Sequence, residues 1–177
     1  MLFRQQANHF AHRNRRITLV DVDNFEGPGS GPGYSLLCCR QHLQRPFYFV
    51  SCDTLWDNAL DWNGEDNWLG VARIPAAESG RYCNLKVVAG NVVELRDNEY
   101  VDDPAYAAFV GLCHIKDYER FWSALESKTT IAGEHQISNG LRALIDSGAT
   151  RARPIAWTDV GDFEKYQAAI SRREDFD

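Results

Sequence analysis

Long apolar runs are missing from this 177-residue sequence. A membrane-spanning helix needs about 20 consecutive apolar residues, and no stretch here approaches that length. The first sixteen residues are rich in His, Arg and Gln, and they lack the apolar centre of a secretory signal peptide. We therefore expect a cytoplasmic protein with no membrane partner.

An excess of positive charge is missing as well. Lys and Arg number 19 against 25 Asp and Glu, which gives a net charge of −6. A protein that follows a phosphate backbone is expected to carry basic patches. The one basic cluster, at Arg13, Arg15 and Arg16, is short and suits a solvated helix end. We expect no nucleic-acid partner.

Paired cysteine motifs are the third absence. The five cysteines are odd in number, form no CxxC pair, and in three cases lie within apolar runs. This spacing excludes a zinc site built from paired cysteines. Reduced, buried thiols of a cytosolic protein explain it best. The sequence also offers no convincing Ser/His/Asp or Cys/His set, so we expect no covalent nucleophile.

What is present is the composition of an ordinary globular domain, with 44% hydrophobic and 25% charged residues. The length suits a single domain over residues 1–177. The hydrophobic pattern predicts strands at Ile17–Val22, Pro46–Ser51, Trp68–Ile74, Tyr82–Val88, Asn91–Leu95, Ala107–Ile115 and Pro154–Trp157. It predicts helices at Met1–His12, at Tyr34–Leu43, after Asp117, at about Glu134–Asp146 with Gly148 as the stop, and after Asp162.

The first fifty residues read as strand, loop, helix and strand. The loop is Gly27–Gly33, which contains glycine, proline and one serine. A parallel crossover is the economical arrangement of such a unit. The run at Pro46–Ser51 is continuously apolar, which predicts a strand covered on both faces.

Two aspartates follow apolar β-type runs about one hundred residues apart. Asp53 follows Phe47–Cys52, and Asp159 follows Pro154–Thr158. In an open α/β sheet, ligands bind outside the carboxyl ends of the strands. Two carboxylates at that edge of the sheet could bind one Mg²⁺ together, because proteins hold this ion by one or two carboxylates plus substrate phosphates. The pair indicates phosphate chemistry on a nucleotide.

These aspartates belong to an ordered series of short motifs. The series is Phe49-Val50-Ser51-Cys52-Asp53-Thr54-Leu55, Tyr82–Val87, Val92–Leu95, Ala108–Leu112, Gly133-Glu134 with Ser138–Leu141, and Trp157-Thr158-Asp159-Val160-Gly161. From about Ile17 to Ala169 the chain resembles the sugar-phosphate nucleotidyltransferase family, including its choline-phosphate cytidylyltransferase relatives. No single motif is specific to this family, but the ordered set of motifs is fairly specific to it.

The resemblance implies a Rossmann-like α/β fold, with a mixed, mostly parallel sheet flanked by helices and a β-hairpin insertion. It implies transfer of a nucleotidyl group from an NTP to a sugar phosphate or phosphocholine-like acceptor, with release of pyrophosphate. Asp53 and Asp159 would be the catalytic Mg²⁺ ligands. Backbone at the four loop glycines would approach the nucleobase: Gly27, Gly29, Gly31 and Gly33. The acceptor site would include Tyr82, Cys83, Gly111 and Glu134.

The sequence also departs from the family pattern. The family opens with a strand and a Gly-rich loop that ends in a basic residue, whereas a polar helix is expected here. We therefore expect the first βα unit to be missing and the domain to be N-terminally incomplete. Arg96-Asp97-Asn98 stands where the family often places Glu-Lys. A sheet edge exposed by the missing unit would invite self-association into a homo-oligomer.

Plainer interpretations stay open for each residue. Asp53 could be a loop carboxylate or a helix cap, and Asp159 could belong to the start of the following helix. Glu134 could be a carboxylate in the first turn of a helix that interacts only with the helix dipole. The Gly27–Gly33 loop could be a flexible turn. Two other functions also stay open: a non-catalytic nucleotide- or sugar-binding or regulatory module derived from this fold, and a nucleotide-sugar glycosyltransferase.

Overall fold

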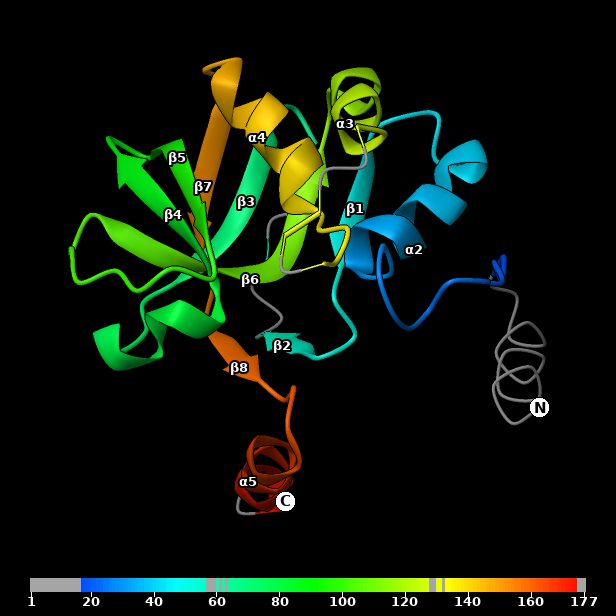
Figure 1. Cartoon of the computed structure of the whole chain (residues 1–177). Coiled ribbons are helices and arrows are strands. Elements are labelled where there is room, and N and C mark those ends of the chain that lie inside the picture. The colour runs from blue at the N-terminus through cyan, green and yellow to red at the C-terminus, as the bar shows by residue number, and fades with distance from the viewer. Residues whose placement is uncertain are drawn as a thin grey trace.

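The computed structural model describes residues 17–56, 60, 62, 64–127, 130–131 and 133–174. Within them, a six-stranded sheet has the strand order β1-β6-β3-β7-β5-β4, and β4 also pairs with the first part of β6. A separate two-stranded sheet pairs β2 with β8 below the main sheet (Figure 1). The strands are β1 Phe47–Val50, β2 Thr54–Trp56, β3 Asn67–Ala72, β4 Cys83–Val88, β5 Asn91–Asp97, β6 Tyr106–Ile115, β7 Thr150–Pro154 and β8 Trp157–Asp159.

Helices gather on one face of the main sheet, where α3 and α4 lie in front of the strands (Figure 1). The α-helices are α2 Pro32–Cys38, α3 Tyr118–Leu125, α4 Ser138–Asp146 and α5 Phe163–Glu174, and short 3₁₀ helices run over Arg40–His42 and Ala76–Arg81. The apolar sides of α3 and α4 join the sheet in the main core, through residues such as Phe121, Trp122 and Leu141. Helix α5 projects below the sheet beyond β8 (Figure 1).

Strand β6 is the centre of the molecule, because all ten of its residues are buried. Phe109 and Cys113 face the main core under the helices. Val110 and Leu112 face a smaller cluster on the opposite side of the sheet, together with Trp68 and Ile155. Alternate residues of one strand therefore serve two hydrophobic layers, which explains its continuous apolar sequence.

The expectation of a mostly parallel sheet is wrong. Only β3 and β7 pair in parallel, whereas the remaining neighbours in the main sheet are antiparallel. Four strands, β1, β3, β4 and β7, do run in one direction. The opposing strands β6 and β5 lie between them, so most hydrogen-bonded pairs are antiparallel. The architecture is a mixed α/β sheet with flanking helices.

Several expected elements are confirmed. The β4–β5 hairpin turns at Ala89 and Gly90, both with positive φ, as a tight hairpin turn requires. Helix α3 begins after Asp117, and α4 is followed by Gly148 in the left-handed conformation. The backbone N–H of Lys165 donates to Asp162 Oδ1 at 2.8 Å, so Asp162 caps α5 through its side chain.

Other expected elements differ from the structure at the N-terminal side. Met1–His12 lies outside the described residues. Ile17–Val22 forms no strand: it pairs with no described strand, and Ile17 and Leu19 remain exposed. The expected parallel crossover is therefore wrong. Strand β1 is covered on only one face, because Tyr48 and Val50 are exposed while Phe47 is buried.

Two boundaries shift for reasons of local hydrogen bonding. Helix α4 begins at Ser138 rather than near Glu134, because residues 133–135 bond to the Gly27–Gly33 loop and to Ile131 instead. The expected strand Pro154–Trp157 spans the junction between β7 and β8, which belong to different sheets. Among the described residues, no helix is both long and apolar enough to cross a bilayer.

Candidate active site

The loop that carries Asp53 is fixed against β6 by backbone and hydroxyl hydrogen bonds. The N–H of Ser51 donates to the Gly111 carbonyl at 2.7 Å, and Thr54 Oγ1 donates to the Val110 carbonyl at 2.5 Å. Gly111 has φ of +72°, and a Cβ there would lie 2.5 Å from Ser51 Oγ. Glycine is therefore needed for both the backbone conformation and the close approach of the loop.

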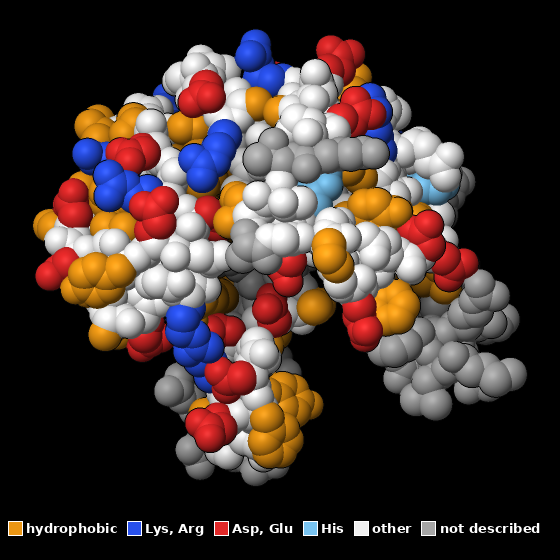
Figure 2. All heavy atoms as spheres, viewed as in Figure 1, with side chains coloured by type: hydrophobic (Ala, Val, Ile, Leu, Met, Phe, Trp, Pro, Cys, Tyr) orange, Lys and Arg blue, Asp and Glu red, His pale blue; other side chains and the backbone are white. Residues whose placement is uncertain are grey.

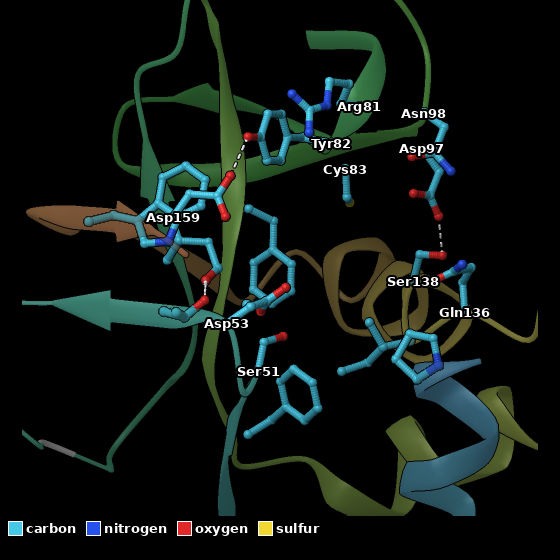
Figure 3. A pocket seen from close by; sticks show the side chains of 18 residues that line it. Ser51, Asp53, Arg81, Tyr82, Cys83, Asp97, Asn98, Gln136, Ser138 and Asp159 are labelled. Carbon is cyan, nitrogen blue, oxygen red and sulfur yellow. Dashed lines mark hydrogen bonds between the residues drawn. The ribbon is translucent and has the colours of Figure 1, made fainter. Parts of the chain in front are cut away.

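Asp159 reaches the same place through the small β2–β8 sheet. Thr54 pairs with Asp159 across these antiparallel strands, and the N–H of Val160 donates to the Asp53 carbonyl at 3.0 Å. A Cβ added to Gly161 would lie 3.1 Å from Asp159 Oδ1 and 3.2 Å from Asp53 Oδ2. Both carboxylates therefore face one spot beside Gly161, at one side of a pocket (Figure 3).

Three donors hold the Asp159 carboxylate. Tyr82 Oη donates to Oδ2 at 2.7 Å, Lys165 Nζ donates to the same oxygen, and the N–H of Gly161 donates to Oδ1 at 2.9 Å. Burial alone would raise the pKa of the Asp159 carboxyl, but hydrogen bonds from Lys165, Tyr82 and Gly161 outweigh it and lower the pKa. Asp159 is thus kept ionised at neutral pH.

The partners of Asp159 respond in the opposite sense. Burial and the hydrogen bond to Asp159 raise the pKa of the Tyr82 hydroxyl. The hydrogen bonds to Asp159 and Tyr82 raise the pKa of the Lys165 ammonium above its ordinary value. Lys165 therefore stays positively charged and Tyr82 stays protonated, so both act as donors to the carboxylate.

Beside the aspartates is a cavity of about 280 Å³, close to the lower limit for small-molecule sites. Side chains from β1, β4, β6 and α4 surround it, and Figure 3 shows Asp53 and Asp159 on one side and Ser138 and Gln136 on the other. Its lining includes Pro32, Phe49, Ser51, Asp53, Arg81, Tyr82, Cys83, Asp97, Asn98, Phe109, Gly111, Gln136, Ser138, Trp157 and Asp159.

The lining of this cavity is acidic. Asp53, Asp97 and Asp159 contribute three carboxylates, and Arg81 is the one lysine or arginine among the described lining residues. Ser138 Oγ donates to Asp97 Oδ2, which links α4 to the end of β5. Figure 2 shows acidic side chains gathered at the hollow above α5. The site therefore suits a ligand that arrives with compensating positive charge.

Cys83 lines the cavity but is poorly suited to act as a nucleophile. Burial, with a further contribution from Asp97, raises the pKa of its thiol well above the ordinary value. The thiolate, which is the reactive form, is therefore disfavoured. The Cys83 side chain therefore forms part of the cavity wall rather than a reactive thiol.

The Gly27–Gly33 loop packs against residues 133–136. Gly29 N donates to the Gly133 carbonyl at 2.8 Å, and Gly33 N donates to the His135 carbonyl at 2.8 Å. A Cβ on Gly33 would lie 2.6 Å from that carbonyl oxygen, and one on Gly31 would lie 2.8 Å from it. These glycines permit close contact with another segment of the protein, and the loop contributes Pro32 to the cavity.

The structure therefore brings together only part of the predicted site. Asp53, Asp159, Tyr82, Cys83 and Gly111 line one cavity. Glu134 is exposed, accepts a hydrogen bond from Gln136 Nε2 at 2.8 Å, and does not line that cavity. The loop glycines also lie outside the lining, namely Gly27, Gly29, Gly31 and Gly33.

Lys165 was not predicted from the sequence, although its ammonium bonds directly to Asp159. A signal was present, because Asp162 is a good helix cap and Lys165 follows three residues later. In the structure Lys165 lies in the first turn of α5, and its ammonium reaches Asp159 of β8. Asp97, Ser138 and Arg81 were missed as well, and their convergence depends on the pairing of distant elements.

The donor set beside Gly161 fits a magnesium ion. The Asp53 carboxylate accepts no hydrogen bond from a described residue, and Asp159 Oδ1 faces the same spot while accepting one bond. Carboxylate oxygens supplemented by phosphate oxygens are the ligands that Mg²⁺ prefers. Among the described residues no cluster of three or more His, Cys, Asp or Glu side chains could hold a metal.

Neither a family model nor a curated protein matches the sequence. Solved structures do match the fold. A UDP-glucose pyrophosphorylase complexed with UDP-glucose aligns with a TM-score of 0.71 at 14% identity, over 86% of this chain and 64% of that chain. A Bacillus anthracis protein assigned as a glucose-1-phosphate thymidylyltransferase, solved with sucrose, aligns with a TM-score of 0.66 at 13% identity, over 82% and 61% of the two chains.

A UDP-glucose pyrophosphorylase from Acinetobacter baumanii aligns with a TM-score of 0.62 at 17% identity, over 79% of this chain and 55% of that chain. These neighbours are sugar-phosphate nucleotidyltransferases, and the chain shares their fold, as the motif series predicts. The chain spans less than two thirds of the length of each of these three structures.

Proposed function

We propose that this chain transfers a nucleotidyl group from an NTP to a sugar phosphate or a phosphocholine-like acceptor and releases pyrophosphate. One observation carries the proposal: Asp53 and Asp159 come from distant parts of the chain and face one spot at the edge of a small-molecule cavity. The fold shared with sugar-phosphate nucleotidyltransferases supports the same reaction class.

The reaction needs positioning more than covalent chemistry. An acceptor phosphate oxygen bonds to the α-phosphorus of the NTP, the bond from that phosphorus to the bridging oxygen breaks, and pyrophosphate leaves with the electron pair. Holding the reactants in line supplies much of the rate acceleration. Mg²⁺ held by Asp53 and Asp159 would neutralise charge on the phosphate oxygens.

The residues of this chain have distinct parts in that scheme. Gly111 lets the Asp53 loop lie close to β6, and Tyr82 and the backbone of Gly161 orient the Asp159 carboxylate. Trp157 packs edge-to-face against Tyr82, with ring centroids 5.6 Å apart, and this contact restricts the phenol. Tyr82, Cys83 and Gly111 border the space in which we place the acceptor.

Pyrophosphate release tests the proposal directly. The purified chain is incubated with Mg²⁺, each NTP in turn and glucose 1-phosphate or phosphocholine, and pyrophosphate is measured with a coupled assay. Asp53→Ala and Asp159→Ala should each reduce turnover at least 100-fold, because charge stabilisation at a transition state contributes about 10²–10³ in rate. Circular dichroism should show a retained fold.

Asp102→Ala is the matched control, because Asp102 is exposed and lines a different hollow. Its turnover should equal that of the unaltered chain. Equal turnover in all three variants would contradict the roles of Asp53 and Asp159. No pyrophosphate with any NTP and acceptor would contradict catalysis by this chain.

A second candidate, a non-catalytic nucleotide- or sugar-binding module, has its own supporting observation. The described lining contains three aspartates and one arginine, and the amides of Gly29, Ser30 and Gly33 in the Gly27–Gly33 loop are already bonded within the protein. Positive charge and free amides for a triphosphate are thus scarce among the described residues. This module would bind UTP or a sugar nucleotide in calorimetry without releasing pyrophosphate.

A further inference from the structure

The positively charged ammonium of Lys165 contacts the Asp159 carboxylate, which faces Asp53. The ammonium bonds to Asp159 Oδ2 and lies 3.0 Å from Tyr82 Oη. The Lys165 side chain is 27% exposed and that of Asp159 is 18% exposed, so the pair is largely shielded from water. Of the two carboxylates beside Gly161, only Asp159 has a cation bonded to it among the described residues.

Helix α5 does not need this contact to hold its first turn. Asp162 caps the helix through its side chain, and the Tyr166 N–H donates to the Asp162 carbonyl at 2.9 Å. Lys165 Nζ also forms a longer ion pair with Asp162 Oδ2, at 3.7 Å, but its short contact is the one with Asp159. The ammonium thus lies nearer to the carboxylate of the site than to its own helix cap.

Together with the bonds from Tyr82 and Gly161, this contact occupies most of the hydrogen-bond acceptor positions of the Asp159 carboxylate. A carboxylate offers about four acceptor positions. Tyr82 and Lys165 occupy Oδ2, and Gly161 occupies one position of Oδ1, so about one position remains on the side that faces Asp53. The summed formal charge of Asp53, Asp159 and Lys165 is one negative charge, where two carboxylates alone would present two.

We propose that Lys165 is an internal counter-ion that keeps free divalent cations off Asp53 and Asp159, so that a metal enters the site together with nucleotide phosphates. This inference rests on the proposed function, which places a metal between the two aspartates. An ammonium a few ångströms from a divalent cation lowers its affinity by about tenfold or more, even at the dielectric constant of water. Phosphate groups bring new negative charge, which pairs with both cations and removes that penalty.

Binding of Mn²⁺, measured by the loss of its free signal in electron paramagnetic resonance, tests the proposal without any turnover. Lys165→Met removes the charge and keeps most of the length of the unbranched side chain, and Lys165→Gln is a second neutral variant. Each should bind Mn²⁺ about tenfold more tightly than the unaltered chain in the absence of nucleotide. Lys165→Arg, which keeps the charge, should bind as weakly as the unaltered chain.

Two controls test whether a gain in Mn²⁺ affinity arises at Asp53 and Asp159. Lys116→Met removes a lysine that lines a different hollow and should leave Mn²⁺ binding unchanged. Adding Asp53→Ala to Lys165→Met should abolish the gain. A gain that survives the loss of Asp53, or neutral variants that fold by circular dichroism and bind Mn²⁺ no more tightly, would overturn the proposal.

Failure here can be told apart from failure of the proposed function. If the unaltered chain releases pyrophosphate in a metal-dependent way while the neutral variants gain no Mn²⁺ affinity, only the counter-ion role is refuted. If the neutral variants gain affinity through Asp53 while the chain releases no pyrophosphate, the counter-ion role stands and catalysis is refuted.

Discussion

Gly111→Ala probes how tightly the Asp53 loop depends on one glycine of β6. The residue has φ of +72°, and its new Cβ would lie 2.5 Å from Ser51 Oγ, 2.7 Å from Ser51 Cβ and 3.1 Å from Thr54 Oγ1. A left-handed backbone costs a residue with a Cβ about 1–2 kcal/mol. Forcing a methyl group into a packed site costs about 1–3 kcal/mol. The expected loss in the free energy of unfolding is therefore about 2–5 kcal/mol.

Gly90→Ala is the matched control for this variant. Gly90 has φ of +78°, and a Cβ there would meet nothing within 4 Å. Only the backbone cost of about 1–2 kcal/mol then applies. The difference between the two variants isolates the contact with Ser51 and Thr54.

Urea unfolding followed by tryptophan fluorescence measures both losses by linear extrapolation. Gly111→Ala should lose about 1–3 kcal/mol more than Gly90→Ala, which is the overpacking cost alone. Equal losses, within the usual ±0.5 kcal/mol of unremarkable substitutions, would show that the loop moves aside without cost and that Gly111 does not fix it.

Two further predictions concern packing and pH. Gly140→Ala should lower the melting temperature, because the new Cβ would lie 2.4 Å from Cε2 of the fully buried Phe121 ring. Overpacking costs about 1–3 kcal/mol, which outweighs the gain of about 1 kcal/mol in helix propensity. A higher melting temperature would contradict this prediction. The folded-state pKa of Asp159 is lowered, so its stabilising contribution is complete above the unfolded pKa of about 3.9 and is lost as pH falls through the folded value. Unfolding free energies measured from about pH 5 to 2 should therefore fall more steeply for the unaltered chain than for Lys165→Met, and parallel curves would count against the Lys165–Asp159 pair.

The elements that the sequence predicted best are those that depend only on residues within one short segment. The apolar run of β6, the Ala89-Gly90 turn and the Asp162 cap each satisfy a local requirement, and each lies where its residues indicate. The order of motifs likewise pointed to the nucleotidyltransferase fold that the solved structures share.

Features that depend on distant partners were predicted less well. Ile17–Val22 has a β-type sequence but pairs with no described strand, and β1 has one exposed face although its sequence is apolar throughout. Strand direction was misjudged because the positions of β6 and β5 between the other strands follow from the whole sheet. Lys165 was overlooked because its partner is fixed only by the fold of β8 and α5.

The order of elements along the chain has a consequence for how the site is assembled. The last strand of the six-stranded sheet ends at Pro154, whereas Asp159, Gly161 and Lys165 all follow it. Chains emerge from the ribosome N-terminus first. The nascent protein can therefore complete its main sheet while Asp53 still has no opposing carboxylate, and residues that follow β7 in the chain then supply both Asp159 and Lys165.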